Sequence, residues 1–267
     1  MRVRLGAVEF LNTRPLIAAL EQESGGDFEL RYAVPSACAR DLHAGRTDVG
    51  LIPSIEYVRS PEPYYIVPDI AISTRGEVLT VRLFLRRTIT EVRRVALDVS
   101  SRTSIALLRI LLREKYGLDP EMVEMAPDLP GMLAEADAAL LIGDMVFQVL
   151  EAGYQSVDLG REWVELTGLP FVFAFWAGRQ DAIVAEQVER LVQARREGEL
   201  QLAGIARQFF EECGGSVEVY ERYLSRHIYF GLGVEEQTGL NEFFRLAHKY
   251  ELIETVPELR FYETPKA

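Results

Sequence analysis

Short runs of β-forming residues alternate with helical patterns along most of the chain, and this alternation restricts the fold more than any other feature of the sequence. In the first part of the chain we expect strands over 3–8, 28–34, 48–52 and 64–73, with helices opening at Pro15, Ser36 and Ser54. Such a βαβα order is typical of a mostly parallel sheet covered by helices. The sequence therefore predicts an α/β fold.

A second unit of the same kind begins near Val78, and a helical segment follows it. The strands expected in this second unit are 78–85, 95–99, 122–125, 138–142 and 171–176. From 181 to 252 the pattern becomes almost wholly helical and rich in charged residues. We therefore expect two α/β lobes with mixed, mostly parallel sheets and a helical C-terminal tail. The first lobe is predicted to comprise residues 1–77 and 180–267, and the second lobe residues 78–179.

The composition argues against several classes of protein. Hydrophobic residues make up 48% of the 267 residues and charged residues 26%, as in a soluble globular protein. Lys and Arg number 29 against 41 Asp and Glu, a net charge of −12, so we expect no nucleic-acid partner. A small anionic ligand is still compatible, because a local pocket can be positive on an acidic protein.

Neither an export signal nor a membrane span is predicted. The first apolar run stops at Glu9, and the most apolar stretch, 169–177, is about half as long as a bilayer requires. The two cysteines, Cys38 and Cys213, cannot form a disulfide framework, which fits a reducing compartment. We therefore expect a cytoplasmic protein with no membrane partner, and leave open whether it is a monomer or a homodimer.

Small polar residues follow several predicted strands at the point where a helix opens. Examples are Asn12-Thr13, Ser54, the stretch 100–104 and Gly143-Asp144. In open α/β sheets ligands bind outside the carboxyl ends of the strands, where helix N-termini favour anions. This arrangement predicts a cleft for a small carboxylate. The alternative is that these residues are ordinary helix caps that serve stability alone.

The motifs that the sequence lacks narrow the chemistry further. Only His43, His227 and His248 occur, and none lies at a predicted strand end. The chain contains no HExxH, CxxC, Walker loop, GxGxxG or GxSxG motif. We therefore expect no metal site. An active site in this chain would use amides, hydroxyls, a carboxylate or the substrate's own groups.

Four further side chains are candidates for the same cleft, each with a structural alternative. Glu56 is either a buried carboxylate with a raised pKa or a first-turn residue that complements the helix dipole. Asp144 either points into the cleft or caps its own helix. Phe171, at the start of an aromatic strand, can reach a ligand or belong to the core. Arg102 can pair with a ligand carboxylate or lie exposed.

Several blocks in order along the chain resemble those of the chorismate dehydratases of the futalosine route to menaquinone. These blocks are VEFLNTRPL, PSIEYVR, PDIAIS with GEVLTV, SSRTSIALLRILL, DAALLIGD and DLGREWVELTGLPFVFAFWAGR. The resemblance runs from Val8 to Arg179 and implies a type II periplasmic-binding-protein-like fold with a ligand cleft between two lobes. It also implies conversion of chorismate, a dianion, to 3-[(1-carboxyvinyl)oxy]benzoate and water, without a cofactor.

The resemblance assigns catalytic roles to Asn12 in the FLN block and to Thr80. The family's GPVxS block reads GEVLT here, so threonine takes the place of serine and keeps the hydroxyl. The residues expected to bind substrate are Phe10, Ser54, Glu56, Ser101, Arg102, Thr103, Ser104, Gly143, Asp144 and Phe171. Two alternatives stay open: a non-catalytic solute-binding protein for small anions, and the related 1,4-dihydroxy-6-naphthoate synthase of the same pathway.

Overall fold

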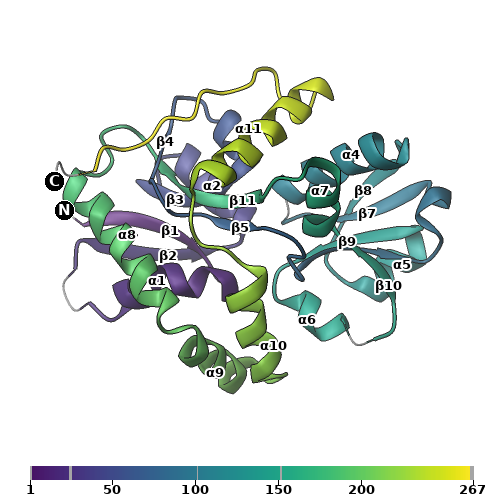
Figure 1. Cartoon of the computed structure of the whole chain (residues 1–267), viewed down its shortest axis with the longest axis horizontal. Helices are drawn as coiled ribbons and strands as arrows, with labels where there is room; N and C mark the ends of the chain where they lie inside the picture. The colour runs from purple at the N-terminus through teal and green to yellow at the C-terminus, as the bar shows by residue number, and fades with distance from the viewer. Residues whose placement is uncertain (1, 24–25, 101, 151, 265–267) are drawn as a thin grey trace.

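Two separate β-sheets, each flanked by helices, form the framework of the protein (Figure 1). The computed structural model describes residues 2–23, 26–100, 102–150 and 152–264. One sheet lies toward each end of the long axis, with both termini beside the larger sheet (Figure 1). The α/β architecture is as the sequence predicts.

The larger sheet has six strands in the described part of the chain. Its order is β2 (Phe28–Ala33), β1 (Val3–Val8), β3 (Val49–Pro53), β11 (Phe171–Gly178) and β4 (Tyr65–Ile66), with β5 (Ile72–Thr74) also paired to β11. β1 runs parallel to β2 and β3, whereas β11 is antiparallel to its three neighbours. Every residue of β3 is buried, as expected for a strand covered on both faces.

Helices from both ends of the chain cover this larger sheet. They are α1 (Arg14–Glu21), α2 (Pro35–His43), α3 (Ser54–Val58), α8 (Ala185–Glu199) and α11 (Val234–Lys249). α1 packs along α8, α2 packs on β1 and β3, and α11 packs on β11. Pro15 stands in the first turn of α1, where its missing N–H leaves no carbonyl without a partner.

The smaller sheet has five strands among the described residues. Their order is β10 (Gln155–Asp158), β6 (Val81–Leu85), β9 (Ala138–Ile142), β7 (Arg94–Asp98) and β8 (Glu121–Met125). β7 is parallel to β8 and β9, and β6 is antiparallel to β9 and β10. The helices of this unit are α4 (Thr103–Tyr116), α5 (Leu129–Glu135), α6 (Met145–Val149) and α7 (Leu159–Thr167).

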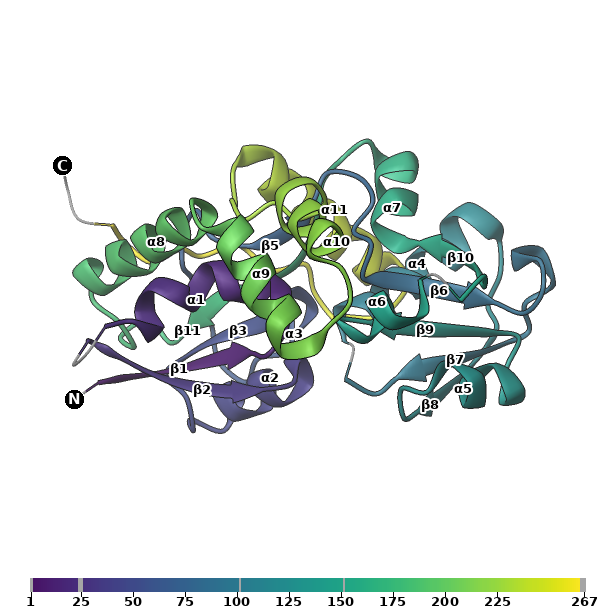
Figure 2. The same ribbon diagram turned by 90° about the horizontal axis from the view of Figure 1, so that it is seen from below.

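The C-terminal segment is helical, as predicted, and reaches the junction of the two sheets. After α8 come α9 (Leu202–Cys213), α10 (Val217–Arg222), a π-helical turn at Tyr223–His227, and α11. Figure 2 shows α9 and α10 beside α1, close to the junction with the smaller sheet. No helix among the described residues is long and apolar enough to cross a membrane.

The strand pairing differs from the sequence-based division at β11. That division placed residues 171–178 in the second lobe, yet β11 pairs with β3 of the larger sheet. Chain order suggested the smaller sheet, but a strand that is apolar on both faces fits the centre of either sheet. Within the described part of the chain, the smaller sheet therefore takes its strands from 81–158.

Two other strand boundaries also differ from the prediction, and both differences lie at residues with positive φ. The expected strand 64–73 is divided into β4 and β5, with Asp69 at φ 60° between them. β6 begins at Val81, because Leu79 at φ 70° interrupts the extended backbone. β10 had no sequence signal that distinguished it from a loop.

Candidate active site

A cavity lies between the two sheets, at the carboxyl ends of β1, β3 and β9. It encloses about 610 Å³ of space, part of it continuous with solvent, and its walls are mostly apolar. Its polar lining residues are Asn12, Thr13, Thr80, Arg102, Thr103 and Ser104. A mostly apolar cleft with a few convergent polar groups is typical of a small-molecule site. Seven of the predicted site residues line it: Phe10, Asn12, Thr80, Arg102, Thr103, Ser104 and Gly143.

Asn12 and Thr80 come from different sheets and are joined by one buried hydroxyl. Asn12 lies in a 3-10 helix, Leu11–Thr13, shortly after the end of β1, and Thr80 directly precedes β6. The Asn12 Nδ2 donates to the Tyr223 hydroxyl at 2.9 Å, and that hydroxyl lies 2.8 Å from Thr80 Oγ1. The Tyr223 side chain is fully buried, and burial raises its pKa above the ordinary value. Tyr223 therefore stays protonated at neutral pH.

The N-terminus of α4 forms another wall of the cavity. Ser104 is buried in the first turn of this 14-residue helix, and Arg102 directly precedes it. The free N–H groups and partial positive charge of a helix N-terminus favour an anion. This wall therefore suits a substrate carboxylate. Ser101, also predicted to bind substrate, lies outside the described residues.

The hydroxyls of Ser54 and Thr103 are committed to a contact between the two halves of the molecule. The Ile55 N–H donates to Thr103 Oγ1 at 3.2 Å, and Thr103 Oγ1 lies 3.4 Å from Ser54 Oγ. Ser54 Oγ in turn donates to the Val172 carbonyl at 2.9 Å. Ser54 is fully buried and does not line the cavity, although the prediction placed it there.

Gly143 and Asp144 hold the smaller sheet against Phe10 and Leu11. Gly143 has φ 72°, and a Cβ at this position would lie 2.6 Å from the Phe10 ring. The Asp144 carboxylate accepts from the Leu11 N–H at 2.9 and 3.2 Å and makes no side-chain cap on α6. Burial raises the pKa of Asp144 to about 7, against the opposing effects of the Leu11 hydrogen bond and Arg14. Asp144 thus neither caps its helix nor lines the cavity.

Glu56 lies away from the cavity, in an ionic cluster. It accepts from Arg59 at 3.0 Å, and one of its oxygens lies 3.4 Å from His43 Nε2. Burial tends to raise the pKa of Glu56, but the hydrogen bond from His43 and the charge of Arg59 outweigh it, so the pKa is lowered. The raised pKa considered for Glu56 was therefore wrong. His43 is half-buried in this cluster.

Phe171 belongs to the core, and Phe173 occupies the cavity wall instead. The Phe171 ring is fully buried, with edge-on contacts to Trp163 and Phe243 at 5.2 and 5.1 Å between centroids. The pairing between β11 and β5 shifts register between Val172 and Ala174. This irregularity changes the direction of the side chain between them, which is that of Phe173. Alternation along the strand could not reveal this shift.

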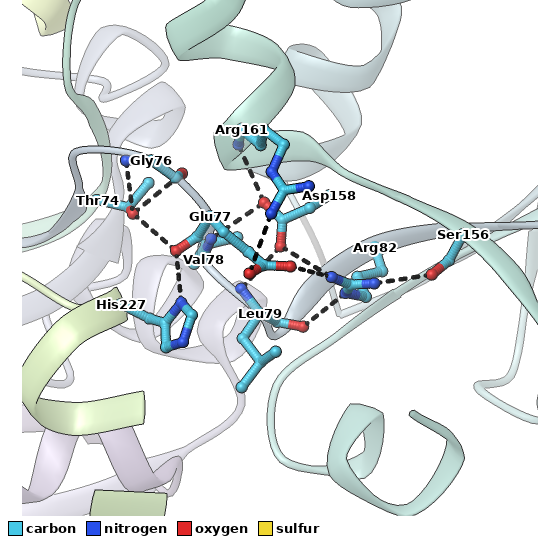
Figure 3. A network of polar contacts seen from close by, with 10 residues as sticks. All are labelled: Thr74, Gly76, Glu77, Val78, Leu79, Arg82, Ser156, Asp158, Arg161 and His227. Atoms are coloured by element: carbon cyan, nitrogen blue, oxygen red, sulfur yellow. Dashed lines mark hydrogen bonds and ion pairs between the residues drawn. The ribbon is translucent and has the colours of Figure 1, made fainter. Parts of the chain in front are cut away.

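A polar network fixes the chain segment that carries Thr80 from one sheet to the other (Figure 3). The Asp158 carboxylate accepts from the N–H groups of Val78 and Leu79 at 3.0 and 2.8 Å. It also caps α7 by accepting from the Arg161 N–H at 3.0 Å. The backbone just before Thr80 is therefore bonded directly to the smaller sheet.

Arg82 completes this network from the neighbouring strand. Its guanidinium pairs with Glu77, lies 3.7 Å from Asp158 and donates to Ser156 Oγ at 2.8 Å (Figure 3). His227 Nδ1 lies 3.0 Å from the Glu77 carbonyl oxygen. The C-terminal segment therefore also contacts the crossing, the chain segment that carries Thr80 from the larger sheet to the smaller one. The crossing is thus held from both sides, which limits where Thr80 can lie.

Sequence reasoning missed Tyr223 and Phe173 as members of the site, and it assigned no substrate-binding role to Thr13. Thr13 lines the cavity, and its Oγ1 is buried with no hydrogen-bond partner among the described residues. Its position beside Asn12 in the FLNT block was the available signal. Tyr223 is 143 residues from Thr80 along the chain, and no motif linked the two.

Nowhere in 2–23, 26–100, 102–150 and 152–264 do three His, Cys, Asp or Glu side chains gather as they would around a metal ion.

Comparison with known proteins identifies the family. A family model described as menaquinone biosynthesis matches residues 3–249. The chain belongs to this family. The resemblance expected from the sequence blocks is therefore confirmed.

Two curated members of this family can be compared over most of their length. The chorismate dehydratase of Thermus thermophilus is 31% identical over 257 residues, covering 90% of this chain and 93% of that protein. The chorismate dehydratase of Campylobacter jejuni is 26% identical over 247 residues, covering 90% and 95%.

Solved structures support the predicted fold. A protein from Archaeoglobus fulgidus superposes with a TM-score of 0.78 at 19% identity, over 94% of this chain and 98% of that one. The periplasmic aliphatic sulphonate binding protein of Escherichia coli gives a TM-score of 0.68 at 15% identity, over 100% and 93%. The periplasmic-binding-protein-like fold is therefore confirmed.

Proposed function

We propose that this protein is a chorismate dehydratase, a carbon–oxygen lyase that eliminates water from chorismate to give 3-[(1-carboxyvinyl)oxy]benzoate. The observation that carries the proposal is the convergence of Asn12 and Thr80 on one cavity, in a chain 31% identical to a chorismate dehydratase. The reaction would be the first step of the futalosine route to menaquinone and would need no cofactor. The proposal places the enzyme in the cytoplasm, where the free Cys38 and Cys213 stay reduced.

The cavity offers a separate surface for each part of this substrate. Chorismate carries two carboxylates, and the N-terminus of α4 with Arg102 and Ser104 is the cavity wall that suits an anion. Phe10 and Phe173 supply apolar surface for the ring. Thr103 is already bonded to Ile55, so Asn12, Thr13 and Thr80 are the polar groups left for the reacting atoms.

The chemistry proposed for this site requires orientation more than a strong base. Chorismate loses the proton from C3 and the hydroxyl from C4, and the ring becomes aromatic, so the overall reaction is strongly favoured. The substrate's own enolpyruvyl carboxylate is the proposed base, held near the C3 proton. Asn12 and Thr80 would orient that carboxylate or donate hydrogen bonds to the departing oxygen. Fixing reacting groups in this way can lower a barrier by roughly 7–11 kcal/mol at best.

A direct assay tests the proposal. Purified protein is incubated with chorismate, the loss of the diene absorbance is followed, and the product is identified by mass spectrometry as chorismate minus one water. Multiple turnovers without added metal or nucleotide are expected. Chorismate that remains unchanged, with folded protein at several pH values, would contradict the proposal and leave the naphthoate synthase and the solute-binding protein as alternatives.

A solute-binding protein is the second candidate, because the fold is shared with a sulphonate-binding protein. The same assay separates the two functions, since a binder would retain chorismate in a one-to-one complex and release it unchanged. Calorimetric titration with chorismate, followed by recovery of the ligand, distinguishes tight binding from conversion.

A further inference from the structure

Tyr223 connects the two residues to which the family resemblance assigns catalysis, although it lies in neither sheet. Its ring packs edge-on against Phe147 at 5.1 Å between centroids, and its hydroxyl bonds both Asn12 and Thr80. It belongs to the π-helical turn Tyr223–His227, and such turns inside helical segments are frequent at functional sites. Tyr223 does not line the cavity, so any effect on substrate must pass through Asn12 or Thr80.

The three groups form a chain of hydrogen bonds with a defined direction. In the structure the Asn12 amide nitrogen faces Tyr223, and an amide nitrogen can only donate. The Tyr223 oxygen therefore accepts from Asn12, and its own proton is free to be donated to Thr80 Oγ1. Either oxygen of the Tyr223–Thr80 pair can donate, but the described residues offer the Tyr223 proton no other acceptor, so we assign that proton to Thr80 Oγ1, which leaves the Thr80 proton for a partner in the cavity. Linked hydrogen bonds of this kind strengthen one another.

We propose that Tyr223 is a positioning residue that fixes the Asn12 amide and turns the Thr80 hydroxyl into a hydrogen-bond donor toward an oxygen of the substrate. This inference rests on the proposed dehydratase function. A fixed donor would stabilise negative charge as it develops on the departing C4 hydroxyl, or would hold a carboxylate oxygen. An unfixed Thr80 hydroxyl would rotate and could present its lone pairs instead.

The surroundings of Tyr223 suit a donor that stays neutral. Its side chain is fully buried, and the pKa is raised first by this burial and further by the nearby carboxylate of Asp144. Tyr223 therefore keeps its proton through the pH range of an assay. It can orient Thr80 under all these conditions and does not take part in proton transfer as a base.

Tyr223→Phe tests the inference, with Tyr220→Phe as a matched control. Tyr220 lies in α10, packs edge-on against the same Phe147 at 5.0 Å and donates its hydroxyl to the Gly214 carbonyl, away from Asn12 and Thr80. For Tyr223→Phe we expect kcat for chorismate to fall about 10- to 100-fold while KM changes less than about 3-fold. For Tyr220→Phe we expect kcat within about 2-fold of the unmodified protein. Thermal melting and circular dichroism show whether each variant is folded.

A double variant separates positioning from a general structural effect. Thr80→Val already lacks the hydroxyl that Tyr223 would orient, so adding Tyr223→Phe removes only its hold on Asn12 and should lower kcat by a smaller factor than Tyr223→Phe does alone. Fully multiplicative losses, or a Tyr223→Phe variant with unchanged kcat, would overturn the inference while leaving the dehydratase function intact. If the unmodified protein does not convert chorismate, the proposed function fails, and this inference fails with it.

Discussion

The carboxylate of Asp144, which follows the smaller sheet's strand β9, accepts a hydrogen bond of 2.9 Å from the backbone N–H of Leu11, which follows strand β1 of the larger sheet. This contact bridges the two halves of the protein beside the cavity, next to Phe10 and Gly143. It involves a partly buried carboxylate that has no cationic group within hydrogen-bonding distance among the described residues. Because burial of this carboxylate raises its pKa despite the Leu11 hydrogen bond, it makes stability depend on pH.

The pH dependence from Asp144 has a definite sign. Its pKa is raised to about 7 in the folded protein, mainly by burial, and lies near 3.9 in an unfolded chain. Between about pH 4 and pH 7 the folded state thus binds more protons at this site, so the free energy of unfolding falls as the pH rises. The loss amounts to a few kcal/mol, on the order of 1.4 kcal/mol per unit of pKa difference.

Asp144→Asn removes this titration and keeps an oxygen that can accept from Leu11. We expect the melting temperature of the variant, relative to the unmodified protein, to rise as the pH increases from 5 to 8. Differential scanning calorimetry over this range provides the measurement. A difference in melting temperature that stays constant with pH would show that Asp144 titrates normally.

Asn12 and Thr80 are expected to control turnover. Asn12→Ala and Thr80→Val each remove a polar group from the reacting end of the cavity, and we expect kcat to fall about 100-fold. Thr80→Ser is the matched control, because it keeps the hydroxyl and should retain most of the activity. Steady-state kinetics with chorismate measures all three. Turnover close to normal in Asn12→Ala and Thr80→Val, with both folded, would remove their assigned roles.

Both residues line one cavity, and the sequence pointed to them in different ways: Asn12 by its place after a predicted strand, and Thr80 by the family resemblance alone. Asn12 lies in the turn that follows β1, and the carboxyl end of a strand is where an α/β sheet exposes ligand contacts. Gly143 was found by the same reasoning. The local sequence pattern was therefore enough to predict that a residue lies at the cavity wherever one strand and the turn after it determine the position of that residue.

Pairing between distant segments could not be predicted in this way. Nothing in the apolar run of β11 distinguishes the larger sheet from the smaller one, and the register shift that exposes Phe173 depends on its pairing with β5. The hydroxyl of Tyr223 reaches Asn12 only because the C-terminal segment returns to the junction of the sheets. The contact of Glu56 with His43 likewise joins α3 to α2, and together with the charge of Arg59 it reversed the expected direction of the Glu56 pKa shift.

Gly143 is expected to be intolerant of a side chain. Its φ of 72° disfavours any residue with a Cβ, and that Cβ would also lie 2.6 Å from the Phe10 ring. Gly153→Ala is a matched control, since Gly153 has φ 77° with nothing within 4 Å. We expect Gly153→Ala to cost about 1 kcal/mol, and Gly143→Ala to cost roughly 1–3 kcal/mol more. Urea unfolding gives both values, and equal losses would show that the Phe10 contact is easily relieved.

Asp158 is expected to be the strongest single support of the chain crossing that carries Thr80. Asp158→Ala leaves the N–H groups of Val78 and Leu79, and of Arg161 in the first turn of α7, without their acceptor. We expect a loss of about 2–4 kcal/mol in the free energy of unfolding.

Asp128→Ala is the control, because Asp128 caps α5 through one exposed hydrogen bond to the Gly131 N–H, and it should cost about 1 kcal/mol. Since Thr80 moves with the crossing, Asp158→Ala should also lower kcat, whereas Asp128→Ala should not. Equal kcat values in the two variants at a temperature where both are folded would show that the crossing does not position Thr80.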